Sequence, residues 1–121
     1  MQIYKNWLRR NGIHFQEEPF GISFQYQGGN FIITENSGDK DYFQLIMPGI
    51  MSVNGNKIKV LESANTINQE LKVVKCIIAG GDSVWLLTEI LLDQTPEIDS
   101  IMPRLLGMLH SARMRFQLLM N

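Results

Sequence analysis

The chain has 121 residues, of which 45% are hydrophobic and 19% are charged, and its formal net charge is −1. These totals fit one globular domain with a single core, and they argue against a general attraction to nucleic acid or anionic lipid. The longest apolar runs fall short of the ~18 residues of a membrane span, and the N-terminus lacks the apolar run of a signal peptide. The single cysteine excludes an internal disulfide, so we expect a cytoplasmic protein without membrane contact.

The N-terminal residues predict a short amphipathic helix over residues 1–11. Its apolar face consists of Ile3, Tyr4, Trp7 and Leu8. Gly12 can adopt the left-handed conformation that ends a helix, and Ile13 follows as the usual apolar contact. Residues 13–16 then predict either a short strand or an extended lead-in, which the Glu-Glu-Pro segment at residues 17–19 should end.

A β-hairpin is predicted next, because residues 21–27 alternate between apolar and polar side chains. Gly28-Gly29 predicts a two-residue loop in which both glycines take positive φ. That loop pairs Phe31 with Tyr26. The inward side chains of both strands then share one face: Ile22, Phe24, Tyr26, Phe31 and Ile33.

A third strand and a second helix follow. Residues 42–47 predict a strand that Pro48-Gly49 should end, with inward side chains Phe43, Leu45 and Met47. A helix over residues 57–72 has an apolar stripe of Val60, Ala64, Ile67 and Leu71. Asn68 falls inside this stripe, where a polar amide needs a partner. Two interpretations stay open: a hydrogen bond to a neighbouring backbone, or a side chain that fixes helix register at a dimer interface.

Residues 73–79 and 83–92 predict the most apolar hairpin of the chain, joined by a Gly-Gly-Asp turn. The preferred register pairs Cys76 with Leu86. It gives one face that is almost purely apolar: Val74, Cys76, Ile78, Val84, Leu86, Ile90 and Leu92.

The other face of this hairpin carries charges as well as apolar side chains. Lys75 lies diagonal to Glu89 there, beside the apolar residues Ile77, Trp85, Leu87 and Leu91. A strand that is apolar on both sides is usually covered on both sides. The C-terminal helix needs one face of the sheet, which leaves the middle helix and this second face to cover each other or to meet a partner. We therefore expect a homodimer that buries the surface around Trp85.

The C-terminal segment predicts a long amphipathic helix, with a main stripe of Ile98, Met102, Leu105, Leu109, Ala112, Phe116 and Leu119. Thr95 suits the N-cap and Pro96 the first helical position. Pro103 lacks the N–H that would bond the carbonyl of Asp99, so we expect a kink or a restart there. A minor stripe either admits another element or reflects scattered surface apolar residues: Gly107, Ser111, Met114 and Leu118.

The predicted order is helix, three or four strands, helix, two strands and helix, in a single domain over residues 1–121. This order corresponds to an α+β fold, α-β-β-β(-β)-α-β-β-α. Its antiparallel sheet has five or six strands and is packed with three helices.

This order and four local features resemble the YbjN-like family of small bacterial proteins, whose fold is that of the type III secretion chaperones. The features are the N-terminal helix before a Gly-Gly hairpin, Asn65-x-x-Asn68, Ser83-Val84-Trp85 and Thr95-Pro96-Glu97. Secretion chaperones dimerise and hold an extended segment of a client protein, and YbjN-like proteins are of unknown or regulatory function. The resemblance spans nearly the whole chain, and it implies a non-enzymatic protein-interaction domain with no catalytic residue.

No set of side chains predicts chemistry. The Gly-Asp-Ser segment that ends at Ser83 is similar to the nucleophile segment of one esterase family. The Asp-x-x-His partner of that segment is missing, because Gly107 stands three residues before His110. We interpret the segment as a turn. His14 and His110 lack partners at ligand spacing, and Cys76 should be a small buried hydrophobe, so we expect no metal and no cofactor.

Three classes of function remain. The first is a protein-interaction domain, the second a small-ligand-binding regulatory domain with a pocket between helix and sheet. The third is an enzyme, which we do not expect because no acid/base or nucleophile set can be assembled. A broad exposed apolar patch would favour the first class, and a pocket with convergent polar groups the second. We expect a homodimer, with a client or regulatory protein as a further partner. The predicted protein-binding residues are Ile77, Trp85, Leu87, Leu91, Asn68, Met114 and Leu118.

Overall fold

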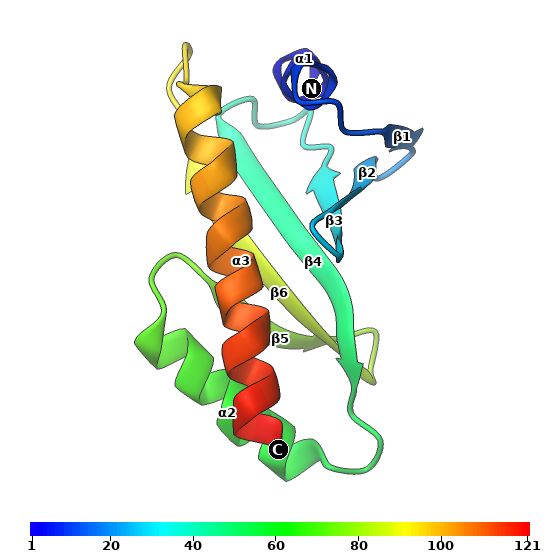
Figure 1. The fold of residues 1–121 in the computed structure, drawn as a ribbon, viewed down its shortest axis with the longest axis vertical. Coiled ribbons are helices and arrows are strands. Elements are labelled where there is room, and N and C mark those ends of the chain that lie inside the picture. Colours follow the sequence, from blue (N-terminus) through cyan, green and yellow to red (C-terminus); the bar gives the residue numbers. More distant parts are fainter.

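Three helices cover one face of a six-stranded antiparallel sheet in the computed structural model, which describes residues 1–121 (Figure 1). The helices are α1 (Gln2–Arg10), α2 (Lys57–Glu70) and α3 (Ile98–Met120). The strands are β1 (Phe15–Glu18), β2 (Gly21–Tyr26), β3 (Gly29–Thr34), β4 (Tyr42–Ser52), β5 (Lys75–Ala79) and β6 (Ser83–Leu91). They lie in the order β1-β2-β3-β4-β6-β5. The predicted α+β class and element order are confirmed, with six strands.

The core lies between the helices and one face of the sheet. Paired residues of neighbouring strands point to the same face of the sheet. Phe24 pairs with Phe31 and Met47 with Leu86, and all four side chains are buried, so they mark the face that the helices cover. These side chains belong to one cluster of 25 buried residues that also takes in residues of all three helices, among them Phe116 of α3. α3 packs on β4 and β6, and α2 packs on β5 and on α3. The middle helix therefore does not cover the second face of the sheet.

The C-terminal end of α1 has the geometry that the sequence predicts. Gly12 takes a φ of +68°, and its N–H donates to the carbonyl of Arg9 at 3.1 Å. The N–H of Ile13 donates to the carbonyl of Leu8 at 2.9 Å, which completes the expected left-handed helix end. The strand after it was predicted at 13–16 and lies two residues later, so its acidic residues belong to β1 instead of ending it.

The β2–β3 hairpin corrects the predicted loop. Gln27 and Gly28 take φ values of +48° and +79° and form the two-residue turn, while Gly29 belongs to β3. Phe31 therefore pairs with Phe24, two residues from the predicted pairing. Packing explains the shift, because a Cβ on Gly29 would lie 3.0 Å from the Phe31 ring. The glycine serves a close approach here and not a turn.

The third predicted strand continues past its expected end. β4 pairs with β6 up to Met47, and pairing resumes at Met51 after an irregularity. Residues 48–50 therefore stand opposite the single residue Trp85. Pro48 lies in this interruption, so its missing N–H removes no regular hydrogen bond between β4 and β6, and the strand can contain a proline.

The β5–β6 hairpin has the predicted register. Ile78 pairs with Val84 and Cys76 with Leu86. β5 begins two residues later than predicted, because Val73 takes a φ of +64° in the connection from α2. α2 itself ends two residues earlier than predicted, and β6 ends one residue earlier.

α3 begins later than its sequence suggested. Ile98 is the first helical residue and Glu97 the N-cap, without a side-chain capping bond, so Thr95 and Pro96 lie before the helix. The helix runs through Pro103 as a single element, and the predicted restart does not occur. No helix of this structure has the length and apolar content that a bilayer crossing needs.

Candidate functional site

The face of the sheet that the helices leave uncovered is the candidate site, and we call it the open face. One row of paired residues crosses it from β2 to β5: Ser23, Ile32, Ile46, Leu87 and Lys75. The same alternation places Tyr42, Gln44, Ile77, Trp85, Glu89 and Leu91 on this face.

Its centre is apolar. Ile46 and Leu87 are paired with each other and are only 6% and 5% exposed, yet neither belongs to the helix-covered core cluster. Neighbouring side chains therefore shield them on a face that carries no helix. Ile32, Ile77 and Trp85 surround this centre and are half-buried. A Trp with hydrophobic neighbours and a part-exposed surface is typical of a protein-contact anchor.

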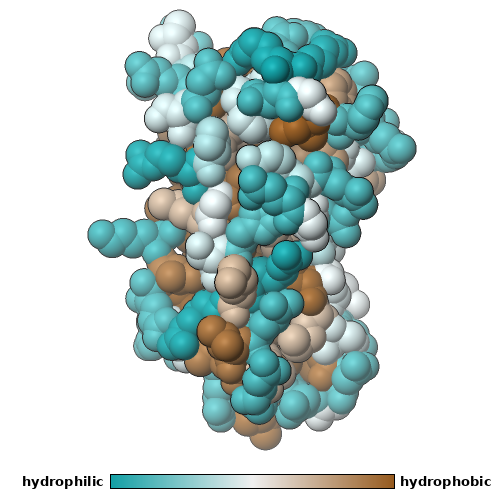
Figure 2. All heavy atoms as spheres, in the orientation of Figure 1, coloured by the Kyte–Doolittle hydropathy of each residue, from teal (hydrophilic) through white to brown (hydrophobic).

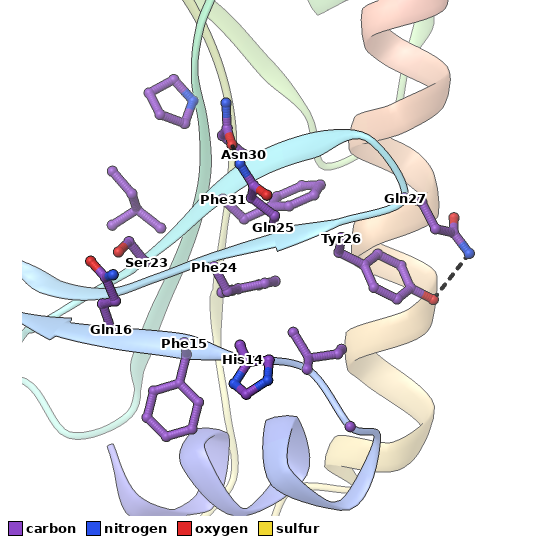
Figure 3. A pocket seen from close by; sticks show the side chains of 14 residues that line it. His14, Phe15, Gln16, Ser23, Phe24, Gln25, Tyr26, Gln27, Asn30 and Phe31 are labelled. Atoms are coloured by element: carbon purple, nitrogen blue, oxygen red, sulfur yellow. Dashed lines mark hydrogen bonds between the residues drawn. The ribbon is translucent and has the colours of Figure 1, made fainter.

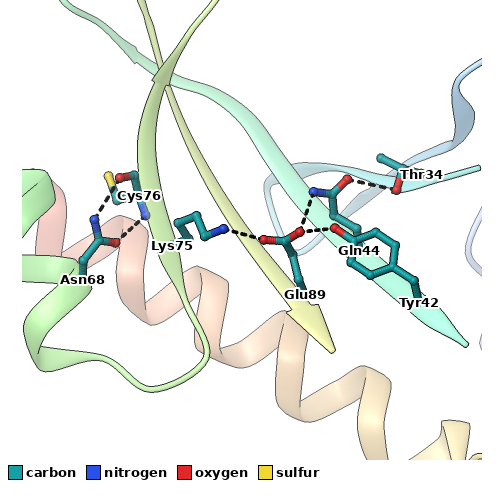
Figure 4. A network of polar contacts seen from close by, with 7 residues as sticks. All are labelled: Thr34, Tyr42, Gln44, Asn68, Lys75, Cys76 and Glu89. Atoms are coloured by element: carbon teal, nitrogen blue, oxygen red, sulfur yellow. Dashed lines mark hydrogen bonds and ion pairs between the residues drawn. The ribbon is translucent and has the colours of Figure 1, made fainter. Parts of the chain in front are cut away.

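A polar network borders the apolar centre (Figure 4). The Glu89 carboxylate accepts a hydrogen bond from Lys75 Nζ at 2.6 Å, one from the Tyr42 hydroxyl, and one from Gln44 Nε2 at 3.4 Å. Thr34 Oγ1 donates to Gln44 Oε1 at 3.0 Å. The predicted diagonal of Lys75 and Glu89 is thus an ion pair at the middle of the network.

These contacts fix the protonation states of the network. Lys75 and Tyr42 stabilise the ionised carboxyl and hold the pKa of Glu89 below its ordinary value. Burial, together with the neighbouring Glu89, raises the pKa of Tyr42 to about 12. Glu89 is therefore an anion and Tyr42 a neutral donor near pH 7.

Asn68 holds α2 against the outer edge of β5. Its Nδ2 donates to the carbonyl of Cys76 at 3.2 Å, and the N–H of Cys76 donates to Asn68 Oδ1 at 2.7 Å (Figure 4). The amide thus occupies two edge groups that an added strand would use. This is the neighbouring-backbone bond that the sequence left as one of two interpretations.

The other predicted binding residues lie on two separate surfaces. Leu91 is 76% exposed at the end of β6, on the open face. Met114 and Leu118 are about as exposed but lie on α3, on the helix side of the molecule. Figure 2 shows apolar atoms dispersed among hydrophilic ones over α2 and the C-terminal half of α3, without one continuous patch.

The structure surrounds the three residues considered for chemistry, Ser83, His110 and Cys76, with different residues. Ser83 begins β6 and pairs with Ala79, whereas His110 Nε2 lies 3.2 Å from the carbonyl of Tyr26. Cys76 is 2% exposed, and burial raises the pKa of its thiol to about 12. No group of three or more His, Cys, Asp and Glu side chains is placed to hold a metal ion.

Several hollows mark the surface, and two of them have volumes of about 600 Å³ or more. A broad one of about 1120 Å³ lies at the start of β1, where β2 continues past its pairing with β1, and no Asp, Glu, Lys or Arg lines it (Figure 3). Its polar groups are mainly the neutral side chains of Gln16, Ser23, Gln25 and Asn30. A second one of about 600 Å³ lies between the α2–β5 connection and α3.

The sequence prediction missed half of the open face. Ile32, Tyr42, Gln44 and Ile46 occupy the outward positions of their strands, and only the inward positions were assigned to a role. The signal was present, since two isoleucines in outward positions mark a second apolar face. Without the strand order, nothing in the sequence joins them to Trp85.

No protein-family model matches the chain, and no curated protein matches it in sequence. Among solved structures, YbjN of E. coli, a candidate transcription regulator, matches 95% of this chain and 87% of its own, with a TM-score of 0.68 and 11% identity. An uncharacterized protein from Methanothermobacter thermautotrophicus matches 98% of this chain and 95% of its own, with a TM-score of 0.63 and 13% identity. Identities this low bear on the architecture alone. The chain has the YbjN-like fold.

Proposed function

We propose that this chain is a non-enzymatic protein-interaction domain that forms a homodimer through the open face of its sheet. One observation carries the proposal. The apolar centre of Ile46 and Leu87, with half-buried Ile32, Ile77 and Trp85 around it, lies on a sheet face without a helix. Such a centre within a polar border has the anatomy of a protein–protein interface.

The electrostatics of the open face suit a second copy of the same chain. Lys75 and Glu89 neutralise each other at 2.6 Å, so two copies can meet without facing like charges. Tyr42 and Gln44 are already hydrogen-bonded to Glu89, which keeps the polar border in a fixed conformation before association. We expect Trp85 to supply the largest single share of the binding free energy.

A regulatory role fits this proposal. YbjN, which shares the fold, is described as a candidate transcription regulator. A domain that acts through protein contacts can regulate without binding nucleic acid itself, and the net charge of −1 gives no general attraction to nucleic acid. The unpaired, buried thiol of Cys76 suits a reducing compartment, and we propose the cytoplasm.

Sedimentation of three proteins at micromolar concentration tests the proposal. The unmodified chain should sediment as a dimer. Trp85→Glu should raise the dissociation constant at least tenfold, because it places a charge beside the apolar centre, while its circular dichroism stays unchanged. Leu118→Glu is the matched control, since Leu118 is 66% exposed on the helix side.

Two results would contradict this assignment. A clean monomer at high concentration would reject the homodimer. Dissociation by Leu118→Glu together with no effect of Trp85→Glu would move the interface to α3.

A further inference from the structure

We propose that the hollow between the α2–β5 connection and α3 binds a small organic anion, a carboxylate carried on a short apolar body. This site is separate from the open face, and the inference does not depend on the dimer. The hollow of about 600 Å³ falls within the range of roughly 300–1,000 Å³ that small-molecule sites occupy.

The sequence builds the hollow from a helix with a small residue and a sharp connection. Gly107 lies on the exposed side of α3, and a Cβ placed on it would meet nothing within 4 Å. Opposite, α2 ends at Glu70 and the chain turns into β5 through Val73 at a φ of +64°. This turn sets Leu71 and Val74 on the wall that faces Met108 of α3. An apolar body placed between them would be covered on two sides.

Two cations at the same hollow lack protein partners. Lys72 and Arg104 both line it, and neither takes part in any of the four ion pairs or in a side-chain hydrogen bond. In contrast, Arg115 already binds the one acidic group of the lining, Glu70, through Nε at 3.0 Å and Nη2 at 2.9 Å. Arg115 also holds the pKa of Glu70 below its ordinary value.

The charge balance therefore favours an anion. The acidic side chain of the hollow is neutralised by Arg115, and the positive charges of Lys72 and Arg104 remain. A carboxylate would gain charge-assisted hydrogen bonds from both, while its apolar body covers Leu71, Val74 and Met108. Inorganic phosphate would use the cations alone, and an alcohol the apolar wall alone.

The test is a titration of the full ¹⁵N-labelled chain with octanoate, followed through backbone amide shifts. Octanoate should shift the amides of Gly107 and Val74 in a saturable manner. Octanol and inorganic phosphate should each bind at least tenfold more weakly. Equal binding of octanol, equal binding of phosphate, or no shift at Gly107 would each overturn the proposal.

Three variants locate the site. Gly107→Leu should weaken octanoate binding at least tenfold, because it fills the hollow, and it should keep or raise the melting temperature since leucine is a better helix former than glycine. Arg104→Gln should also weaken binding. Arg113→Gln is the matched control, since Arg113 lies on the same helix outside the hollow and bonds the carbonyl of Gly28.

Each variant result bears on the proposal. Binding that survives Gly107→Leu, or that falls as much with Arg113→Gln as with Arg104→Gln, would reject the hollow as the site. Trp85→Glu should leave octanoate binding unchanged, so failure of the dimer and failure of this site are separate outcomes.

Discussion

Asn68 shows how much one side chain can contribute at the edge of a sheet. Both ends of its amide are bonded to the backbone of Cys76, at 3.2 Å and 2.7 Å. A buried backbone group without a partner costs free energy, and a free strand edge can pair with another chain. Asn68 therefore serves two purposes, because it anchors α2 and closes part of the edge of β5.

Asn68→Ala should lower the free energy of unfolding by about 1–3 kcal/mol, because it leaves the N–H and the carbonyl of Cys76 without their partner. Equilibrium denaturation in urea measures the loss. Asn65→Ala is the matched control, since Asn65 is exposed on the same helix and should change stability by less than about 0.5 kcal/mol. Losses of equal size in the two variants would show that the amide bonds contribute little.

At the scale of elements, α3 makes the clearest prediction. Phe116 is fully buried in the core cluster, whereas Met114 is 64% exposed on the same helix. Phe116→Ala should cost about 3–5 kcal/mol of unfolding free energy, through lost burial and the cavity it leaves. Met114→Ala should cost less than about 0.5 kcal/mol. A loss well under 1 kcal/mol for Phe116→Ala would mean that the helical stripe is misassigned.

The elements also show what sequence can and cannot predict. The register of the β5–β6 hairpin is the predicted one, because a one-residue slip would mix charged side chains into the core. The predicted register of the β2–β3 hairpin is wrong by two residues, because its two glycines have different roles. Of the two glycines, only Gly28 takes a positive φ. Gly29 is required by close packing against Phe31 and against Met47 and His110, which are far away in the sequence. Local patterns identify a turn, but tertiary contacts decide which glycine forms it.

At the scale of the whole molecule, the sequence indicates that the sheet has a second apolar face but not whether a helix covers it. The stripe of α2 could cover either side of the sheet, and the connections place it beside α3. The accessible surface of 7186 Å² is larger than the about 6,700 Å² expected for a compact monomer of this mass. That excess fits a sheet covered on one face.

If the open face is the dimer interface, folding and association are linked, because a partner that binds only the folded chain stabilises it by mass action. The melting temperature of the unmodified chain should therefore rise as its concentration is raised from the micromolar range upward. Trp85→Glu should melt at a lower temperature that no longer depends on concentration, while Leu118→Glu should keep the dependence. Scanning calorimetry over a hundredfold range of concentration measures all three. A melting temperature of the unmodified chain that stays constant over that range would show that no association stabilises the folded chain, and it would contradict the open face as a dimer interface.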